Sequence, residues 1–176
     1  MTFLKAQVKE LCSNYGTIHG FWWDMNVPEY YDPTVNDMIR KLQPDAIINN
    51  RGFDEGDYGT PERNEDKDAN EARAFKGATE ACESLDSLSW GYNKGAEYYT
   101  DRHLTGSIDR YFSASANYLL NVGPTAEGLI PETSAAILKR IGKWYASVKT
   151  SYEAVQPVTQ IITNPEVSVT RRNQTY

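Results

Sequence analysis

At 176 residues the chain is long enough for one hydrophobic core, and its 40% hydrophobic and 24% charged residues exclude the composition of a disordered protein. A net charge of −6 argues against a nucleic-acid partner, because a phosphate backbone requires clustered Lys and Arg. The two cysteines, Cys12 and Cys82, lack the CxxC or histidine-rich partners of a zinc site, so we expect two buried thiols.

The first part of the chain predicts alternating helices and strands. Apolar residues recur at helical spacing over 3–15 and 33–42, and Gly16 follows the first helix where a left-handed C-cap is expected. Short apolar runs at 17–23 and 45–49 predict buried parallel strands, each followed by polar residues.

The alternation continues after a long polar segment. Residues 50–78 lack apolar periodicity, which is typical of a functional loop. A strand over 79–88, a helix over 99–112, a strand over 118–122 and a helix over 131–148 follow. This order predicts an α/β fold, a partial (β/α)8 TIM-like barrel that represents its C-terminal half, with about four parallel strands.

A dinucleotide-binding sheet is the main alternative for this order of elements. It requires a GxGxxG motif after a strand. The first predicted strand is instead followed by Asp24, Met25, Asn26, Val27 and Pro28. The sequence therefore argues against this alternative.

The ends of the chain carry weaker signals. We expect the barrel region at 1–155 and, at 156–176, a linker or the start of a missing β-rich segment, because Thr, Val and Asn are enriched there. No signal peptide and no membrane-spanning stretch are expected from the sequence as given, so no membrane partner is predicted. Asn173 begins a glycosylation sequon, and the compartment stays open.

Asp24 is the first candidate for catalysis. It follows two tryptophans at the end of a predicted strand, where barrel enzymes hold their reacting groups. A helix N-cap would place an Asp at the same kind of junction, and the pattern alone does not choose between these roles. Adjacent residues of a strand face opposite sides, so one of Trp22 and Trp23 can pack in the core while the other lines the mouth of a site.

A second carboxyl group is needed for a reaction such as glycoside cleavage with retention, which uses one nucleophile and one proton donor. Spacing does not choose among the glutamates available, which are Glu55, Glu62, Glu65, Glu71, Glu80 and Glu83. Arg51 follows the second predicted strand and is either a site residue or a solvated surface arginine. His19 and His103 are too far apart in sequence to indicate a metal site or a triad, and we expect both to be structural.

Five motifs, in this order, resemble the glycoside hydrolase family 29 α-L-fucosidases. They are FWWD at 21–24, NNRG at 49–52, GDYGTPE at 56–62, SWGYN at 89–93 and NYLLNVGP at 117–124. The resemblance covers about residues 1–155. It implies a retaining hydrolase that removes terminal α-L-fucose from oligosaccharides or glycoprotein glycans without a cofactor.

The resemblance also implies residue roles. Asp24 maps onto the nucleophile, and the GDYGTPE motif favours Glu62 as the acid/base, with Glu80 as the second choice. Arg51 resembles the arginine that reaches the fucose and the nucleophile, and Trp90 resembles part of the wall that packs the C6 methyl group. The predicted substrate-binding residues are Trp23, Arg51, Trp90 and Glu80.

One part of the family pattern has no counterpart here. The family's first barrel strands supply histidines and aromatic groups to the sugar hydroxyls, and nothing in this sequence corresponds to them. We therefore expect little or no activity from the chain alone, unless self-association through the open barrel edges rebuilds a pocket. A fucose-binding half-domain without turnover and an inactive truncated fragment are the alternative functions.

Overall fold

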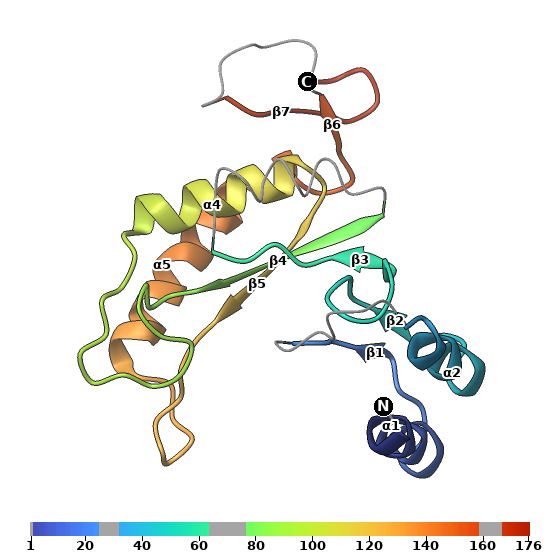
Figure 1. Cartoon of the computed structure of the whole chain (residues 1–176). Helices are drawn as coiled ribbons and strands as arrows, with labels where there is room; N and C mark the ends of the chain where they lie inside the picture. Colours follow the sequence, from blue (N-terminus) through green and yellow to red (C-terminus); the bar gives the residue numbers. More distant parts are fainter. Residues whose placement is uncertain (1, 25–31, 64–76, 159–166) are drawn as a thin grey trace. The chain divides into compact units, whose positions relative to one another are not determined.

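The computed structural model describes residues 2–24, 32–63, 77–158 and 167–176. Contacts within the chain define two compact units (Figure 1). Of the described residues, the first unit comprises 2–24, 32–60 and 77–78, and the second comprises 61–63, 79–158 and 167–176.

The first unit places two helices against short strands. It contains α1 (Thr2–Asn14), β1 (Gly20–Phe21), α2 (Thr34–Leu42), β2 (Ile47–Ile48) and β3 (Tyr58–Gly59). β1 and β2 pair in parallel, and α1 and α2 pack side by side (Figure 1). The unit buries an apolar core of Val8, Cys12, Val35, Ile39, Ala46, Ile48 and Phe53.

Local sequence explains where these helices end. Gly16 has a φ of 81°, the left-handed conformation predicted after α1. Gln43 leaves the helical region after α2, because Pro44 disfavours a helical conformation in the residue before it. The Gln43 amide donates to the carbonyl groups of Cys12 (2.7 Å) and Gly16 (3.0 Å), which ties the ends of the two helices together.

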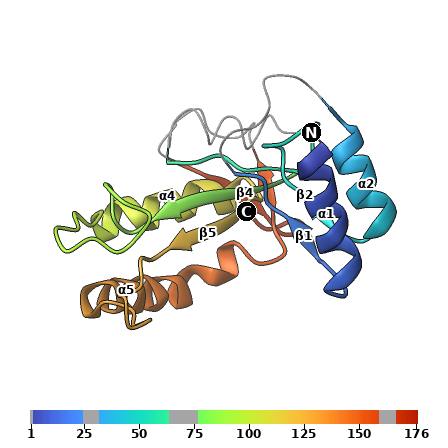
Figure 2. The same ribbon diagram turned by 60° about the horizontal axis from the view of Figure 1, so that its bottom comes forward.

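The second unit is built around a β–α–β–α sequence. It contains β4 (Ala78–Ser84), α4 (Asp101–Ser113), β5 (Asn117–Asn121), α5 (Glu132–Val148), a 3₁₀ turn (Lys149–Ser151), β6 (Gln156–Val158) and β7 (Val169–Arg171). β4 and β5 run in parallel side by side (Figure 2). α4 and α5 pack against each other over a core of Leu85, Leu104, Ile108, Ile137 and Ile141.

The four predicted helices are present, each within two residues of its expected bounds. The prediction of fully buried strands is wrong in part, because one face of each strand packs against its unit while the other is open. Ile48 has no exposed surface, whereas Ile47 is 54% exposed and Leu119 is 41% exposed. The prediction of two buried thiols is also wrong in part. Cys12 is buried as expected, but Cys82 is only half-buried because of the same alternation along β4.

The tail after α5 forms a short antiparallel pair, β6 with β7. Whether residues 156–176 lead into a further β-rich segment stays a prediction. None of the helices in the described ranges has the length and apolar character needed to cross a bilayer.

Candidate active site

Asp24 and Arg51 meet at the ends of two paired strands. Asp24 follows β1 by three residues and Arg51 follows β2 by three residues. Because β1 and β2 are parallel, their carboxyl ends lie at the same edge of the sheet. Asp24 Oδ1 lies 3.9 Å from Arg51 Nη1, and the Asp24 side chain is 70% exposed. Such an exposed pair adds little stability, but it leaves an accessible carboxylate beside a fixed positive charge.

The Arg51 side chain is held by other groups of the first unit. Its Nε donates to Thr60 Oγ1 and its Nη2 to the Thr60 carbonyl group, both at 2.7 Å. The guanidinium carbon lies 4.5 Å from the centre of the Trp22 ring, within the range of a cation–π contact. Arg51 is therefore positioned independently of its contact with Asp24.

The two adjacent tryptophans have different surroundings. The Trp23 ring packs edge-on against Phe53 at 4.9 Å, and its Nε1 donates to Asn36 on α2 at 3.0 Å. Trp22, by contrast, is 36% exposed and lies against Arg51. The Trp23 ring thus packs against other residues of the first unit, and its role as a substrate-binding residue stays a prediction. Strand alternation signalled that one ring would face inward, but it did not say which.

The second unit contains the other predicted residues. Glu62 is half-buried and forms a parallel bridge with Cys82 on β4. Trp90 lies in the β4–α4 loop, which we define as residues 85–100. Its ring lies 4.1 Å from the Arg63 guanidinium carbon, and its carbonyl group accepts a hydrogen bond from Asn121 Nδ2 at 2.6 Å. Arg63 was not selected from the sequence, because a single arginine in an acidic loop carries no pattern.

The candidate glutamates lie at different levels of the sheet. Glu80 pairs with Asn117, the first residue of β5, so it lies at the amino end of the β4–β5 ladder. Glu62 is level with Cys82, two residues nearer the carboxyl end. Of the remaining glutamates, Glu83 is 3% exposed, Glu55 is exposed, and Glu65 and Glu71 lie outside the described residues.

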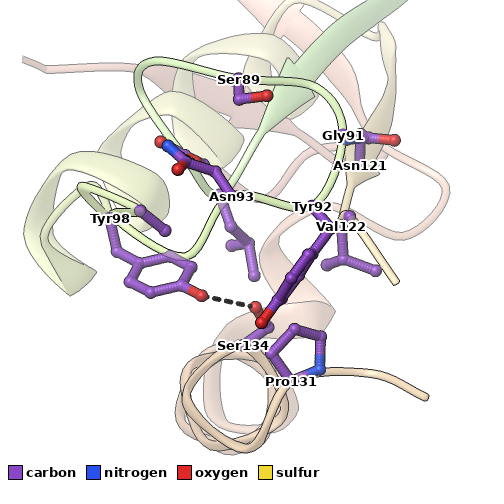
Figure 3. Close-up of a pocket in the computed structure, with 13 residues that line it drawn as sticks. Ser89, Gly91, Tyr92, Asn93, Tyr98, Asn121, Val122, Pro131 and Ser134 are labelled. Atoms are coloured by element: carbon purple, nitrogen blue, oxygen red, sulfur yellow. Dashed lines mark hydrogen bonds between the residues drawn. The ribbon is translucent and has the colours of Figure 1, made fainter. Parts of the chain in front are cut away.

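A pocket lies between the β4–α4 loop, the end of β5 and the start of α5 (Figure 3). Ser134 Oγ donates to Tyr98 Oη at 3.2 Å on one side of it, and Tyr92 and Asn93 come from the loop. Its cavity volume is about 10 Å³, which suits about one water molecule. The pocket is therefore too small for a monosaccharide, and none of the predicted site residues lines it.

Within the described parts of the chain, no three His, Cys, Asp or Glu side chains are grouped so that they could hold a metal ion. The structure thus brings Asp24 to Arg51 in the first unit. Glu62, Glu80 and Trp90 belong to the second unit, in which Trp90 contacts Arg63.

Comparisons with known proteins agree on one family. The α-L-fucosidase family model matches residues 1–149. The plasma α-L-fucosidase of Rattus norvegicus is 35% identical over 79 residues, which are 43% of this chain and 17% of the rat protein. The α-L-fucosidase isoenzyme 1 of Paenibacillus thiaminolyticus is 30% identical with a TM-score of 0.73, over 97% of this chain and 44% of that one.

One of the similar solved structures contains a bound substrate. A mutant of the α-L-fucosidase AlfC, in complex with 4-nitrophenyl-α-L-fucopyranoside, is 27% identical with a TM-score of 0.66, over 83% of this chain and 44% of that one. The parallel α/β units and the carboxylate at a strand end are features of barrel glycosidases. With the family match, they show that the chain belongs to the α-L-fucosidases of glycoside hydrolase family 29. It spans less than half the length of the solved relatives that it matches.

Proposed function

We propose that this chain contributes to the catalytic domain of a retaining exo-α-L-fucosidase, which hydrolyses terminal α-L-fucose from glycans. The observation that carries the proposal is the Asp24 carboxylate, which is exposed at a strand end and 3.9 Å from the well-held Arg51. The family match supports it, as does the aryl α-L-fucoside bound to a related enzyme.

The reaction is a double displacement. Asp24 attacks the anomeric carbon and forms a fucosyl-enzyme ester, while Glu62 donates a proton to the departing glycosidic oxygen. Glu62 then removes a proton from water, which attacks the ester and releases fucose with its original configuration. Arg51 orients the Asp24 carboxylate, and the exposed Trp22 beside it offers an aromatic face to the sugar.

Glu62 is our choice over Glu80 as the acid/base. Catalytic groups of barrel enzymes lie at the carboxyl ends of the strands, whereas residues at the amino ends serve stability. Glu80 is opposite the first residue of β5, and Ser84, four residues further on, is the last residue of β4. At about 3.3 Å per residue, Glu80 is about 13 Å from that end. Glu62, level with Cys82, lies two residues nearer the carboxyl end of β4 than Glu80 does.

We assign residues 1–155 to the C-terminal half of a (β/α)8 barrel, and residues 156–176 to a linker or the start of a β-rich segment. This reading fits the parallel strand pairs and the 44% coverage of the Paenibacillus enzyme. Half of the fucose pocket would then lie outside this chain. A monomer should have little activity, and self-association through the open strand edges would be needed to form a pocket.

The test is hydrolysis of 4-nitrophenyl α-L-fucopyranoside by the 176-residue chain, assayed across size-exclusion fractions whose masses are measured by light scattering. We expect slow turnover in the associated fractions, lost in Asp24→Asn and Glu62→Gln but retained in Glu80→Gln. Wild-type turnover by Asp24→Asn would refute the assignment of the nucleophile. A folded chain without turnover in any fraction would contradict the activity and favour a fucose-binding or inactive half-domain.

A further inference from the structure

Arg63 connects the segment that carries Glu62 to the end of β4. Its Nη1 donates to the Ser87 carbonyl group at 2.9 Å, and its Nη2 donates to Ser84 Oγ at 2.6 Å and to the Asp86 carbonyl group at 3.2 Å. The backbone of Arg63 has a φ of 51°, a left-handed conformation that is unfavourable for a bulky residue. The hydrogen bonds offset this strain, and such outliers are concentrated at functional sites.

The same guanidinium group lies over the Trp90 ring. The distance of 4.1 Å from its carbon to the ring centre is well within the range of a cation–π contact. Asn121 holds the Trp90 backbone from the last position of β5, through the 2.6 Å hydrogen bond to its carbonyl group. The ring and the backbone of Trp90 are therefore held by two different segments.

The β4–α4 loop has its own internal support. The Asp86 carboxylate accepts hydrogen bonds from the backbone of Leu88 (2.9 Å), the backbone of Glu97 (3.3 Å) and the side chain of Asn93 (3.3 Å). These contacts do not involve Arg63. Loss of the Arg63 side chain should consequently release the Trp90 ring while the loop stays folded.

We infer that Arg63 is a positioning residue that sets the Trp90 ring relative to the backbone carrying Glu62. The inference deepens the proposed function, on which its catalytic consequence rests. If Trp90 packs the C6 methyl group of fucose, Arg63 determines how well the site distinguishes α-L-fucosides from α-L-galactosides, which carry a hydroxyl group on C6. An apolar wall lowers kcat/KM for a substrate with an added hydroxyl group by up to about a hundredfold.

The first experiment is a double-mutant cycle with Arg63→Met and Trp90→Leu, read by urea unfolding of the full chain, because leucine has no aromatic face for the guanidinium group. A cation–π pair predicts a coupling of about two- to thirtyfold in the unfolding equilibrium constant. Arg140→Met, which removes an exposed ion pair with Asp101 in the same unit, is the control and should show no coupling to Trp90. Arg63→Lys keeps the charge but not the planar set of donors, so it should retain only part of the coupling.

The second readout is the ratio of kcat/KM for 4-nitrophenyl α-L-fucopyranoside to that for 4-nitrophenyl α-L-galactopyranoside. Arg63→Met should lower this ratio several-fold and Arg140→Met should leave it unchanged, whereas a general loss of structure would lower both rates in parallel. Absence of coupling in both Arg63 variants, or a parallel loss of both activities, would overturn the inference. Coupling in a chain that hydrolyses neither substrate would support the positioning of Trp90 and count against the proposed function alone.

Discussion

Replacing Gly123 with alanine tests how closely the end of β5 packs against the β4–α4 loop. A Cβ atom at position 123 would lie 2.4 Å from the carbonyl carbon of Gly91 and 2.5 Å from both the Gly91 oxygen and the Tyr92 nitrogen. Non-bonded carbon atoms prefer separations of about 3.5–4.0 Å, so the loop must move by about 1 Å. All three neighbours are backbone atoms, and no rotamer change can relieve the clash.

We expect Gly123→Ala to lower the free energy of unfolding by about 1–3 kcal/mol, the usual cost of overpacking. The measurement is urea unfolding followed by circular dichroism, in which the midpoint falls while the slope is unchanged. The matched control is Gly142→Ala, because Gly142 lies within α5 and a Cβ atom there meets nothing within 4 Å. That variant should gain about 0.5–1 kcal/mol, since alanine favours a helix over glycine.

The outcome that refutes this reasoning is a Gly123→Ala chain as stable as the wild type. Such a result would mean that the loop moves away from β5 without loss of favourable contacts. Because Gly91 directly follows Trp90, the same substitution should also alter the Trp90 environment, visible as a change in tryptophan fluorescence that Gly142→Ala does not produce.

Two further predictions concern the surroundings of ionisable groups. Burial raises the pKa of the Cys12 thiol, so at pH 8 it should be alkylated by iodoacetamide more slowly than the half-buried Cys82; peptide mass spectrometry that finds equal rates would contradict this. The Arg140 guanidinium holds the pKa of Asp101 below its usual value of 3.8. The ion pair therefore stabilises the folded state at pH values above 3.8, and this stabilisation is lost as the pH falls through the lowered pKa of Asp101. Asp101→Asn should therefore lower the melting temperature at pH 7 but no longer at acidic pH, and a constant difference across that range would show that the ion pair is not its cause.

Much of the local structure could be predicted from residue patterns. The apolar spacing over 131–148 predicted α5 to within a residue, and Gly16 marked the end of α1 through its left-handed conformation. These features depend on contacts between residues three or four positions apart, which a sequence displays directly. The placement of Asp24 and Arg51 after two strands followed in the same way, because Asp24 comes directly after an apolar run and Arg51 comes two residues after the next one.

The candidate site itself depended on contacts between residues distant in sequence. Strand alternation showed that Trp22 and Trp23 face opposite sides, but only packing against Phe53 and Asn36 selected Trp23 for the core. The register that places Glu80 at the amino end of the β4–β5 ladder likewise depends on contacts between distant segments, and the role of Glu80 stays a prediction. The sequence could not show this packing or this register, since each depends on which distant segment lies beside the residue in the folded chain.

The sequence by itself thus determined the family, the helices and the acid at the end of β1, because motifs and periodicity are local properties of the chain. The tertiary structure decided which side chains work together, as in the contact of Arg63 with Trp90 and the bond from Asn121 to the Trp90 backbone, 31 residues away. The physical reason is that parallel strands bring together residues separated by whole helices, and their register is set by packing rather than by short-range pattern.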